Sequence, residues 1–549
     1  MNGQRRTQGA RWLAVSAVFV TAMAGCTGAG TSSDGASGAS ALGRDPTTLV
    51  VAVDAIDGDF DPASSYLVNQ AVIWLGIYEG LVRLKGESAS EVEPLLADSW
   101  EHNGDASSWT FHLHPDVTFT DGTHLDAEAV KANYVRTITG NFGTGYILGA
   151  FVPKPDKQIV VLDPLTVRFD LAYPYPRFDV VLAAEYGTGL VSPAVFTEHS
   201  TGPDDQGHEF LQGNAIGTGP YLLQSFEAGD QAVLVRNPNY WRGWNGWHFD
   251  RIILRSIPEA STRRQLIESG EVDIAYAGTA EDTAAVRQDP GVVAGSFKNL
   301  ELVYIILGEY GPFASPEARQ AMNYLFPYDE FVSTVMKDTF VRANGPFPDL
   351  LFTHDPNVFT YDTDVEKARQ LLAQVGVEPG TELTYEYYTG FGKEAGLVMQ
   401  QQLEKVGLHL RLIEKEFSAF NADLTTDRPV SERADMYYWS WWPDYDDPSD
   451  YSWIILSSDA APDACSCYNS GYYHNAEVDR IIDAGFQETD PDKMTAMFAR
   501  AQDIMTRVDP PMIAVGQHLE STYLRDDIKG HVFNPLYIAT FDFYALHRG

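Results

Sequence analysis

Predicted strands and helices alternate along the chain from residue 48 onward, as the spacing of apolar positions indicates. Residues 48–53 are mostly apolar and β-branched, and residues 109–113 alternate apolar and polar side chains, so both segments are predicted strands. Apolar side chains three and four positions apart predict helices over 316–325, 365–375 and 394–406. Because the two kinds of element alternate without a repeat period, we expect an α/β architecture.

Two further segments carry signals for a helix start and for a turn. Asp126 is placed to cap a helix over 127–138. Gly217, Gly219 and Pro220 predict a chain reversal into a strand that begins at Tyr221, since glycine permits a positive φ and proline fixes the next bend.

The densest aromatic run is residues 437–443 (YYWSWWP), followed by Asp444. As a strand, this run carries Tyr438, Ser440 and Trp442 on one face and Trp439 and Trp441 on the other. We expect one face to be buried and the other to line a cleft. In the alternative, the tryptophans belong to the core and Asp444 begins an acidic turn or caps a helix.

The first 25 residues have the pattern of a secretory signal peptide. A basic start without acids precedes an apolar run over 12–22, which is too short for a stable membrane span. Small residues then lead into Cys26, and this order resembles a bacterial lipobox, in which the cysteine is acylated; an ordinary signal peptide is the alternative. We expect a signal peptide over 1–25 and a Gly/Ser-rich flexible tether over 26–46.

Length, charge and cysteine content narrow the function classes. A chain of 549 residues implies several domains or lobes. The formal net charge of −38 would repel phosphate backbones, so no nucleic-acid partner is expected. Of the three cysteines, acylation would use Cys26, which leaves Cys465 and Cys467 as a local disulfide or as free thiols. Even with His474, the two thiolates would leave a tetrahedral zinc site one ligand short. We expect neither a metal nor another cofactor.

Four groups of motifs, in chain order, cover essentially all of the chain after the tether. They resemble the large extracytoplasmic solute-binding proteins of ABC importers, family 5, the oligopeptide, dipeptide and nickel type. The motifs are IYEGLV (77–82) with EPLLADSW (93–100), WTFHL (109–113) with VTFTDGT (117–123), GTGPY (217–221) with RNPNYW (236–241), and DYDDP (444–448) with YNSG (468–471) and NAEVD (475–479).

The resemblance implies a bilobal, periplasmic-binding-protein-like clamp of the large cluster C type, with a hinge between its lobes. It implies a first lobe built from residues 47–82, 213–300 and 508–549, an inserted domain II over 83–212, and a second lobe over 301–507. Ligand would be held between the lobes by hinge closure.

The resemblance also assigns roles to single residues. The aspartate that matches Asp444 holds a ligand α-ammonium, and the aromatic strand before it runs beside the ligand. Tyr66, Leu67 and Val68 match the segment that pairs with the ligand main chain from the other side. The residue that grips a ligand carboxylate has no clear match; of Lys393, Arg428 and Arg433 we favour Arg433, because it precedes the aromatic strand.

We therefore expect a lipid-anchored, non-enzymatic receptor on the outer face of the cytoplasmic membrane. It would act as a monomer that captures oligo- or dipeptides and delivers them to the permease and ATPase subunits of an ABC importer. An oligosaccharide ligand is the alternative within this class, since tryptophans stack on sugars. A secreted hydrolase, a nickel-binding protein and a lipid-anchored adhesion or signalling module are further alternatives, although the chain has no catalytic motif such as GxSxG or HExxH.

Overall fold

A mixed sheet of eleven strands is the largest element of the fold. The computed structural model describes residues 45–64, 68–140, 142–276, 278–465, 467–537 and 541–549. Within these residues the strands of the sheet are β1 (Thr48–Val53), β8 (Tyr221–Glu227), β9 (Gln231–Arg236), β10 (Arg251–Ser256), β11 (Ile274–Tyr276), β12 (Val292–Leu307), β13 (Phe340–Val341), β14 (Glu382–Tyr388), β15 (His409–Lys415), β16 (Met436–Trp441) and β17 (Met512–Arg525). Their order is β15-β14-β16-β12-β17-β11-β1-β10-β9-β8, and β13 pairs with β17 outside this order.

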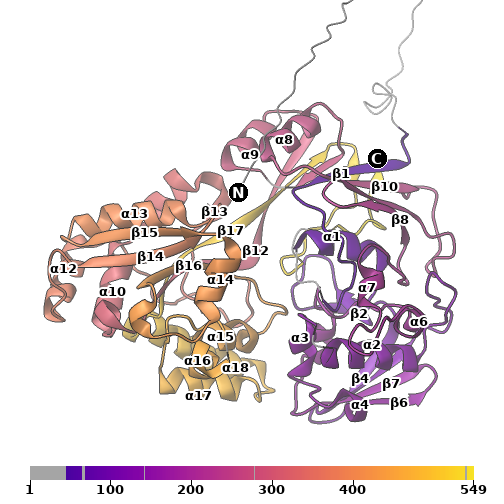
Figure 1. Ribbon diagram of the computed structural model, residues 1–549, viewed down its shortest axis with the longest axis horizontal. Helices are drawn as coiled ribbons and strands as arrows, with labels where there is room; N and C mark the ends of the chain where they lie inside the picture. The colour runs from indigo at the N-terminus through magenta and orange to yellow at the C-terminus, as the bar shows by residue number, and fades with distance from the viewer. Residues whose placement is uncertain (1–44, 65–67, 141, 277, 466, 538–540) are drawn as a thin grey trace, which may run out of the picture. The chain divides into compact units, whose positions relative to one another are not determined.

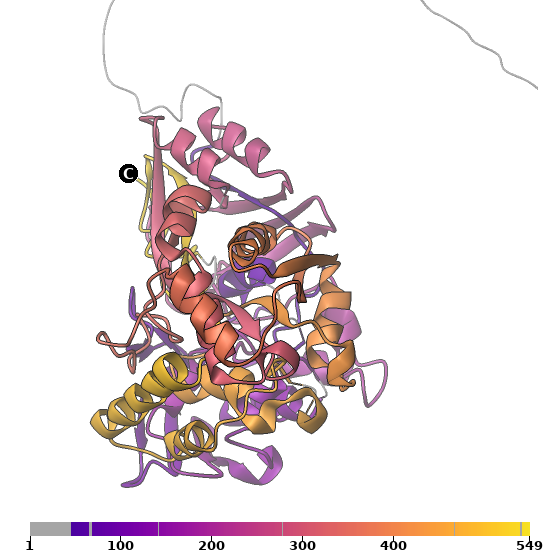
Figure 2. The ribbon, with the colours of Figure 1, turned by 90° about the vertical axis from the view of Figure 1, so that its left-hand side faces the viewer.

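The long strands β12 and β17 connect the two groups of strands in this sheet. They pair antiparallel from one end to the other, and Figure 2 shows pink β12 beside yellow β17. β16 pairs with the second half of β12, and β11 pairs with the end of β17, so each group attaches at a different end (Figure 1). The β12–β17 register shifts between Lys298 and Leu302, in the middle of both strands.

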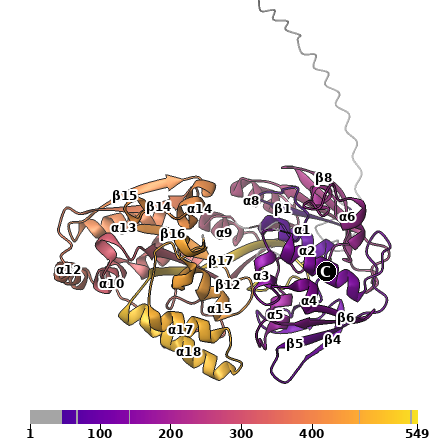
Figure 3. The ribbon, with the colours of Figure 1, turned by 60° about the horizontal axis from the view of Figure 1, so that its bottom comes forward.

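A separate four-stranded antiparallel sheet, in the order β4-β5-β7-β6, forms between β3 and α5 of the chain. Figure 3 shows it with its short helices. Its elements are β4 (Ala97–His102), β5 (Ser108–Leu113), α2 (Ala127–Thr139), α3 (Gly145–Gly149), α4 (Pro155–Gln158), β6 (Ile159–Asp163), β7 (Thr166–Asp170) and α5 (Phe178–Leu182). The predicted cap is confirmed, because the Asp126 carboxylate accepts from the Ala129 amide at 2.8 Å.

The other helices and short strands complete a mixed α/β architecture, as predicted. They are α1 (Val68–Ile77), β2 (Val82–Leu84), β3 (Val92–Pro94), α6 (Pro193–Glu198), α7 (His208–Leu211), α8 (Ala260–Glu268), α9 (Ala280–Val286), α10 (Pro316–Leu325), α11 (Tyr328–Glu330), α12 (Val365–Gln374), α13 (Lys393–Glu404), α14 (Phe417–Thr425), α15 (Pro448–Leu456), α16 (Pro462–Cys465), α17 (Ala476–Gly485), α18 (Pro491–Asp503), β18 (Ile528–Lys529) and β19 (His547–Arg548). The predicted helices 316–325, 365–375 and 394–406 correspond to α10, α12 and α13. Among the described residues, we find no helix with the length and apolarity that a membrane span requires. The lobe and domain boundaries given above stay a prediction.

One buried carboxylate joins motifs that are far apart in the sequence. Glu79, at the end of α1, accepts hydrogen bonds from the Tyr240 hydroxyl at 2.7 Å and from the Trp241 indole at 2.9 Å. The Thr218 hydroxyl donates to the same carboxylate at 2.9 Å. Burial raises the pKa of Glu79, and these three donors oppose that rise. The motifs around residues 79, 218 and 240 therefore form one structural unit.

The sequence analysis singled out Gly217 and Gly219 correctly, but the reason that it gave, a positive φ, is wrong. Neither glycine has a positive φ. Instead both pass close to the end of α1: an added Cβ at Gly217 would lie 2.1 Å from the Ile77 carbonyl oxygen, and one at Gly219 would lie 2.6 Å from it. Glycine is required there because the two backbones touch, as the 2.8 Å bond from the Gly219 amide to the Ile77 carbonyl shows.

Candidate ligand-binding site

Three neighbouring strands end at one edge of the large sheet. β14 pairs in parallel with β15 and with β16, so the carboxyl ends of the strands, at Tyr388, Lys415 and Trp441, face the same way. In open α/β sheets, ligands bind outside the carboxyl ends of parallel strands. Asp444 follows β16 directly after a short turn and therefore lies at this edge.

Asp444 is a buried carboxylate beside a second one. Its side chain is 5% exposed, and the Tyr146 hydroxyl donates to it at 2.6 Å. Its backbone amide donates to the Asp450 carboxylate at 3.0 Å. Burial and the charge of Asp444 raise the pKa of Asp450 well above its usual value. A cation next to this pair would offset the free-energy cost of burying a charged carboxylate and the repulsion between the two carboxylates.

The two aspartates that follow bind residues of the four-stranded sheet's domain. The Arg177 guanidinium donates to the Asp446 backbone carbonyl at 2.7 Å and to its carboxylate at 3.1 Å. The Tyr175 hydroxyl donates to Asp447 at 2.6 Å, and Asp447 also caps α15. Burial raises the pKa of Asp446 to about 6, although Arg177 lowers it. In this acidic segment, Asp446 and Asp447 therefore have packing roles, whereas Asp444 and Asp450 lie together as a pair of carboxylates.

The tryptophans of β16 lie where the period-two pattern predicts. Trp439 and Trp441 belong to one hydrophobic core cluster, and Tyr438 belongs to the cluster on the other side. Tyr468 stacks on Trp439, with ring centroids 5.2 Å apart, and lies 5.9 Å from Trp441. Both indole N–H groups are buried, and among the described residues neither has a hydrogen-bond partner.

Ser440 and Trp442 differ from these two tryptophans. Ser440 is half-buried. Burial raises the pKa of Tyr388, at the end of β14, and the Ser440 side chain opposes that rise. Trp442 follows the strand, and its indole N–H donates to the Leu536 carbonyl at 3.1 Å. Trp442 is therefore held by the C-terminal segment, whereas Ser440 lies at the edge that carries Asp444.

The second predicted contact segment is described only in part. Tyr66 and Leu67 lie outside the described residues, and Val68 is the first residue of α1. The turn before them is fixed: the Thr144 hydroxyl donates to the Ala63 carbonyl at 2.7 Å. Thr144 is two residues from Tyr146, which donates to Asp444. The structure thus brings the turn that leads into residues 65–67 close to the segment that contacts Asp444.

The candidate cations lie in different places. Arg433 precedes β16, at the opposite end of the strand from Asp444, and its guanidinium donates to the backbone carbonyls of Leu424 and Thr426, each at 3.2 Å. Arg428 pairs with Asp423 at 2.9 Å. Lys393 begins α13, just beyond the carboxyl end of β14. The role of Arg433 in holding a ligand carboxylate stays a prediction.

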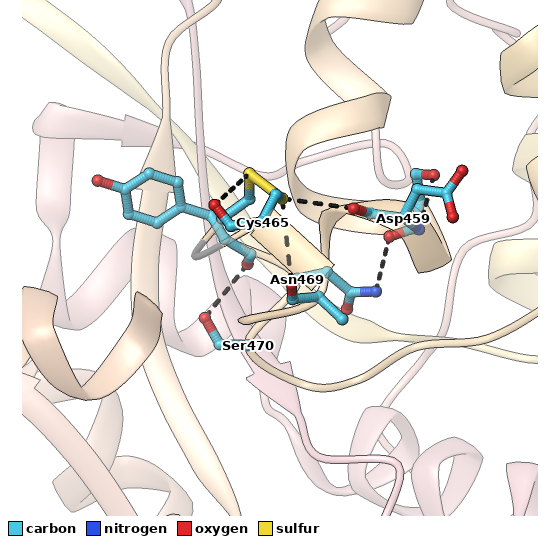
Figure 4. Close-up of a disulfide and its surroundings, with 8 residues drawn as sticks. Asp459, Cys465, Asn469 and Ser470 are labelled. Carbon is cyan, nitrogen blue, oxygen red and sulfur yellow. Dashed lines mark hydrogen bonds between the residues drawn. A yellow bond between two sulfur atoms is a disulfide. The ribbon is translucent and has the colours of Figure 1, made fainter. Parts of the chain in front are cut away.

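A disulfide joins Cys465 and Cys467 at the end of α16 (Figure 4). The sequence left a disulfide and free thiols open for these two cysteines, and the structure contains the disulfide. Asn469, close by, donates to the carbonyls of Ser457 and Tyr473, both at 2.9 Å. The bridged segment leads directly into Tyr468, the ring that stacks on Trp439. Cys26 lies outside the described residues.

Two contributors to this edge were missed by sequence reasoning. Tyr146 lies in a segment without a motif and 298 positions from its partner, so no local signal identifies it. Tyr468 opens the YNSG motif, which we quoted only for the resemblance. A cavity of about 320 Å³ lies elsewhere, bordered by Trp74, Glu79 and Tyr537, and none of the predicted site residues that the structure describes lines it.

Comparisons with known proteins agree with the resemblance. The model of bacterial extracellular solute-binding proteins, family 5 (middle), matches residues 91–463. Probable D,D-dipeptide-binding periplasmic protein DdpA of Escherichia coli (strain K12) is 29% identical over 508 residues, which cover 91% of this chain and 94% of that protein. Heme-binding protein A of Haemophilus influenzae is 25% identical over 482 residues, 84% of this chain and 85% of that protein.

A solved structure shows the same fold. The ABC transporter-associated periplasmic binding protein DppA from Helicobacter pylori, in complex with peptide STSA, superposes with a TM-score of 0.77 at 22% identity, over 91% of this chain and 98% of that one. This likeness confirms the predicted binding-protein fold of the cluster C type. The family model covers more than half of the chain, and the chain therefore belongs to family 5 of the bacterial extracellular solute-binding proteins, the non-enzymatic solute-binding components of ABC importers.

Proposed function

We propose that this protein captures peptides and presents them to the permease of an ABC importer. The observation that carries the proposal is the buried carboxylate of Asp444 beside the half-buried one of Asp450, at the carboxyl edge of three parallel strands. Charge-assisted hydrogen bonds between an ammonium and a carboxylate are among the strongest polar contacts in proteins. A peptide α-ammonium beside Asp444 would supply the positive charge that this pair favours.

The names of the relatives support the same ligand class. The E. coli protein is named for D,D-dipeptides, and the H. pylori structure holds the peptide STSA. At these identities the names do not fix the ligand, and one relative is named for haem. We therefore rest the assignment on Asp444 and its neighbours.

The direct test is to identify what the protein carries. We expect mass spectrometry of the purified protein under native conditions to detect a bound peptide with a free amino terminus. Peptides of a library should raise the thermal midpoint by mass action and should remain chemically intact. Peptide cleavage at catalytic rates would instead support a secreted hydrolase.

An oligosaccharide is the second candidate. Trp439 and Tyr468 present stacked rings. The indole N–H groups of Trp439 and Trp441, which have no hydrogen-bond partner in the part of the chain that the structure describes, suit the hydroxyl oxygens of a sugar. This reading predicts that neutral glycans raise the thermal midpoint while free and N-acetylated peptides do not.

We also propose that Cys26 carries a lipid anchor, because small residues precede it and a Gly/Ser-rich tether follows. Two or three acyl chains retain a protein at a membrane, whereas one chain holds it only marginally. The wild-type protein should fractionate with membranes and Cys26→Ser should be released. Wild-type protein found entirely in the medium would refute the anchor.

A further inference from the structure

A continuous series of ring contacts runs along the edge that carries Asp444. Each ring in the series lies within about 6 Å of the next, centroid to centroid. The contacts are Trp441–Tyr468 (5.9 Å), Tyr468–Trp439 (5.2 Å), Trp439–Phe420 (6.0 Å), Phe420–Tyr388 (5.3 Å), Tyr388–Phe391 (5.2 Å) and Tyr388–Phe417 (5.3 Å). The series therefore reaches from the strand that precedes Asp444 to the loop after β14, which carries Phe391, and to the start of α14, which carries Phe417.

The series passes from buried rings to exposed rings. Phe420 is fully buried and Trp439 is 7% exposed, whereas Phe391 is 57% exposed and Phe417 is 54% exposed. Isolated exposed apolar side chains are ordinary, but these two contact the same ring, Tyr388. We name Tyr388, Phe391 and Phe417 the aromatic rim.

The backbone holds Phe391 in place. Gly390 and Gly392 on either side both have φ of +90°, which favours glycine. An added Cβ at Gly392 would lie 2.4 Å from the Tyr438 ring, so no other residue fits this loop unless Tyr438 moves. The Thr389 amide donates to the Lys415 carbonyl at 2.9 Å, which ties the loop of Phe391 to the end of β15, two residues before Phe417. The backbone that carries Phe391 is therefore restrained at both glycines and at Thr389.

We propose that the aromatic rim is a subsite for a large apolar side chain of the bound peptide. The proposal rests on the peptide function proposed above and names the peptides that the protein would prefer. Neighbouring strands lie about 4.8 Å apart, so the carboxyl ends of β14 and β15, which lead into Phe391 and Phe417, lie roughly 5 and 10 Å from the line of β16. An extended chain advances about 3.3 Å per residue, so a peptide with its ammonium at Asp444 reaches the rim with about its second to fourth residue.

The side chains of the aromatic rim suit a ligand side chain that is large and apolar. Phe391 and Phe417 have no hydrogen-bonding groups in their side chains, so the Tyr388 hydroxyl is the only polar side-chain group of the rim. The two exposed rings offer no polar side-chain contact, and a large apolar side chain therefore gains most by covering them.

The test compares the affinities of closely related peptides by titration calorimetry. The probes are tetra-alanine and the three tetrapeptides in which phenylalanine replaces alanine at position two, three or four. Wild-type protein should bind one phenylalanine peptide about tenfold more tightly than tetra-alanine, since covering roughly 50–60 Å² of apolar surface has this effect. Phe391→Ala or Phe417→Ala should reduce that preference to about threefold or less and leave the tetra-alanine affinity unchanged.

Leu397→Ala is the matched control. Leu397 is 48% exposed on α13 in the same part of the fold but lies outside the rim, so its loss should leave every affinity unchanged. All three side chains are exposed, and we expect the thermal midpoints of the variants to match that of the wild type.

The outcomes separate the two proposals. Peptide binding with a phenylalanine preference that survives both rim substitutions refutes the subsite and leaves the peptide function intact. Wild-type protein that binds none of these peptides, and no other free peptide, refutes the peptide function and the subsite together. Unchanged peptide affinity with reduced uptake in a reconstituted transporter would make the rim a surface for the permease and would refute the subsite.

Discussion

Neutralising Asp61 should destabilise the protein by about 3–5 kcal/mol, because Asp61 is one partner of a buried ion pair. Its side chain is fully buried and that of Arg136 is 4% exposed. Arg136 donates to both carboxylate oxygens, His208 adds a third contact at 3.0 Å, and the Ala63 amide donates at 3.0 Å. Asp61→Asn keeps the shape of the side chain, but it leaves the guanidinium buried without a counter-charge.

The matched control is the pair of Arg168 and Asp170. This pair also has two contacts, at 2.8 and 2.9 Å, but its side chains are 36% and 39% exposed. Exposed pairs contribute about 0–1 kcal/mol, so Asp170→Asn should change the free energy of unfolding by less than about 1 kcal/mol. Urea unfolding at pH 7, with equal m-values for all proteins, measures both changes. Asp61→Asn within 1 kcal/mol of the wild type would refute the reasoning.

The same pair predicts the direction of two pH effects. Burial opposes the charge of Asp61, but the bonds from Arg136 and His208 outweigh it and lower its pKa. The stability from Asp61 is therefore present above its ordinary pKa and lost as the pH falls through the lowered value. The pKa of His208 is raised, chiefly by its bond to Asp61, so the stability from His208 is present below about 6.5 and is lost as the pH rises through the raised value. Asp61→Asn should return the pKa of His208, followed by NMR, toward its ordinary value.

Two further substitutions separate structural roles from ligand contacts. Arg433→Ala should cost roughly 2–3 kcal/mol in urea unfolding, because its guanidinium donates to carbonyls at the end of α14. As the predicted carboxylate partner, Arg433 should also matter for binding: the variant should bind free peptides more weakly than the wild type does but C-terminally amidated peptides equally well. Wild-type affinity of the variant for both forms would refute that role and leave only the structural one. Burial raises the pKa of Asp446 to about 6, so the wild type should lose about 2–3 kcal/mol of unfolding free energy, relative to Asp446→Asn, as the pH rises from 4 to 7. Parallel pH profiles for the two proteins would contradict this assignment.

The features that the sequence predicted well depend on local rules. Asp126 caps α2 because its carboxylate accepts a hydrogen bond from the backbone amide three residues later, and this contact needs no other part of the chain. Trp439 and Trp441 share a face of β16 because strand side chains alternate. Both predictions need only a few consecutive residues.

The features that were missed depend on the tertiary fold. Tyr146 reaches Asp444 across 298 positions, and Arg136 reaches Asp61 across 75, so neither pair has a signature in the sequence. Gly217 was correctly marked as special but for the wrong reason, since its constraint comes from Ile77 in another segment. The candidate site is assembled from such contacts, and for that reason the sequence predicted its strand and its aspartate but not its neighbours.

The affinity of Asp444→Asn for free and N-acetylated forms of one peptide tests the central claim most directly. Removal of the carboxylate or of the ammonium should each weaken binding by about 2–4 kcal/mol, which is about 30- to 1,000-fold in Kd. Because both changes remove the same contact, acetylation should have little further effect in Asp444→Asn. Wild-type affinity of Asp444→Asn for both forms of the peptide would contradict the account.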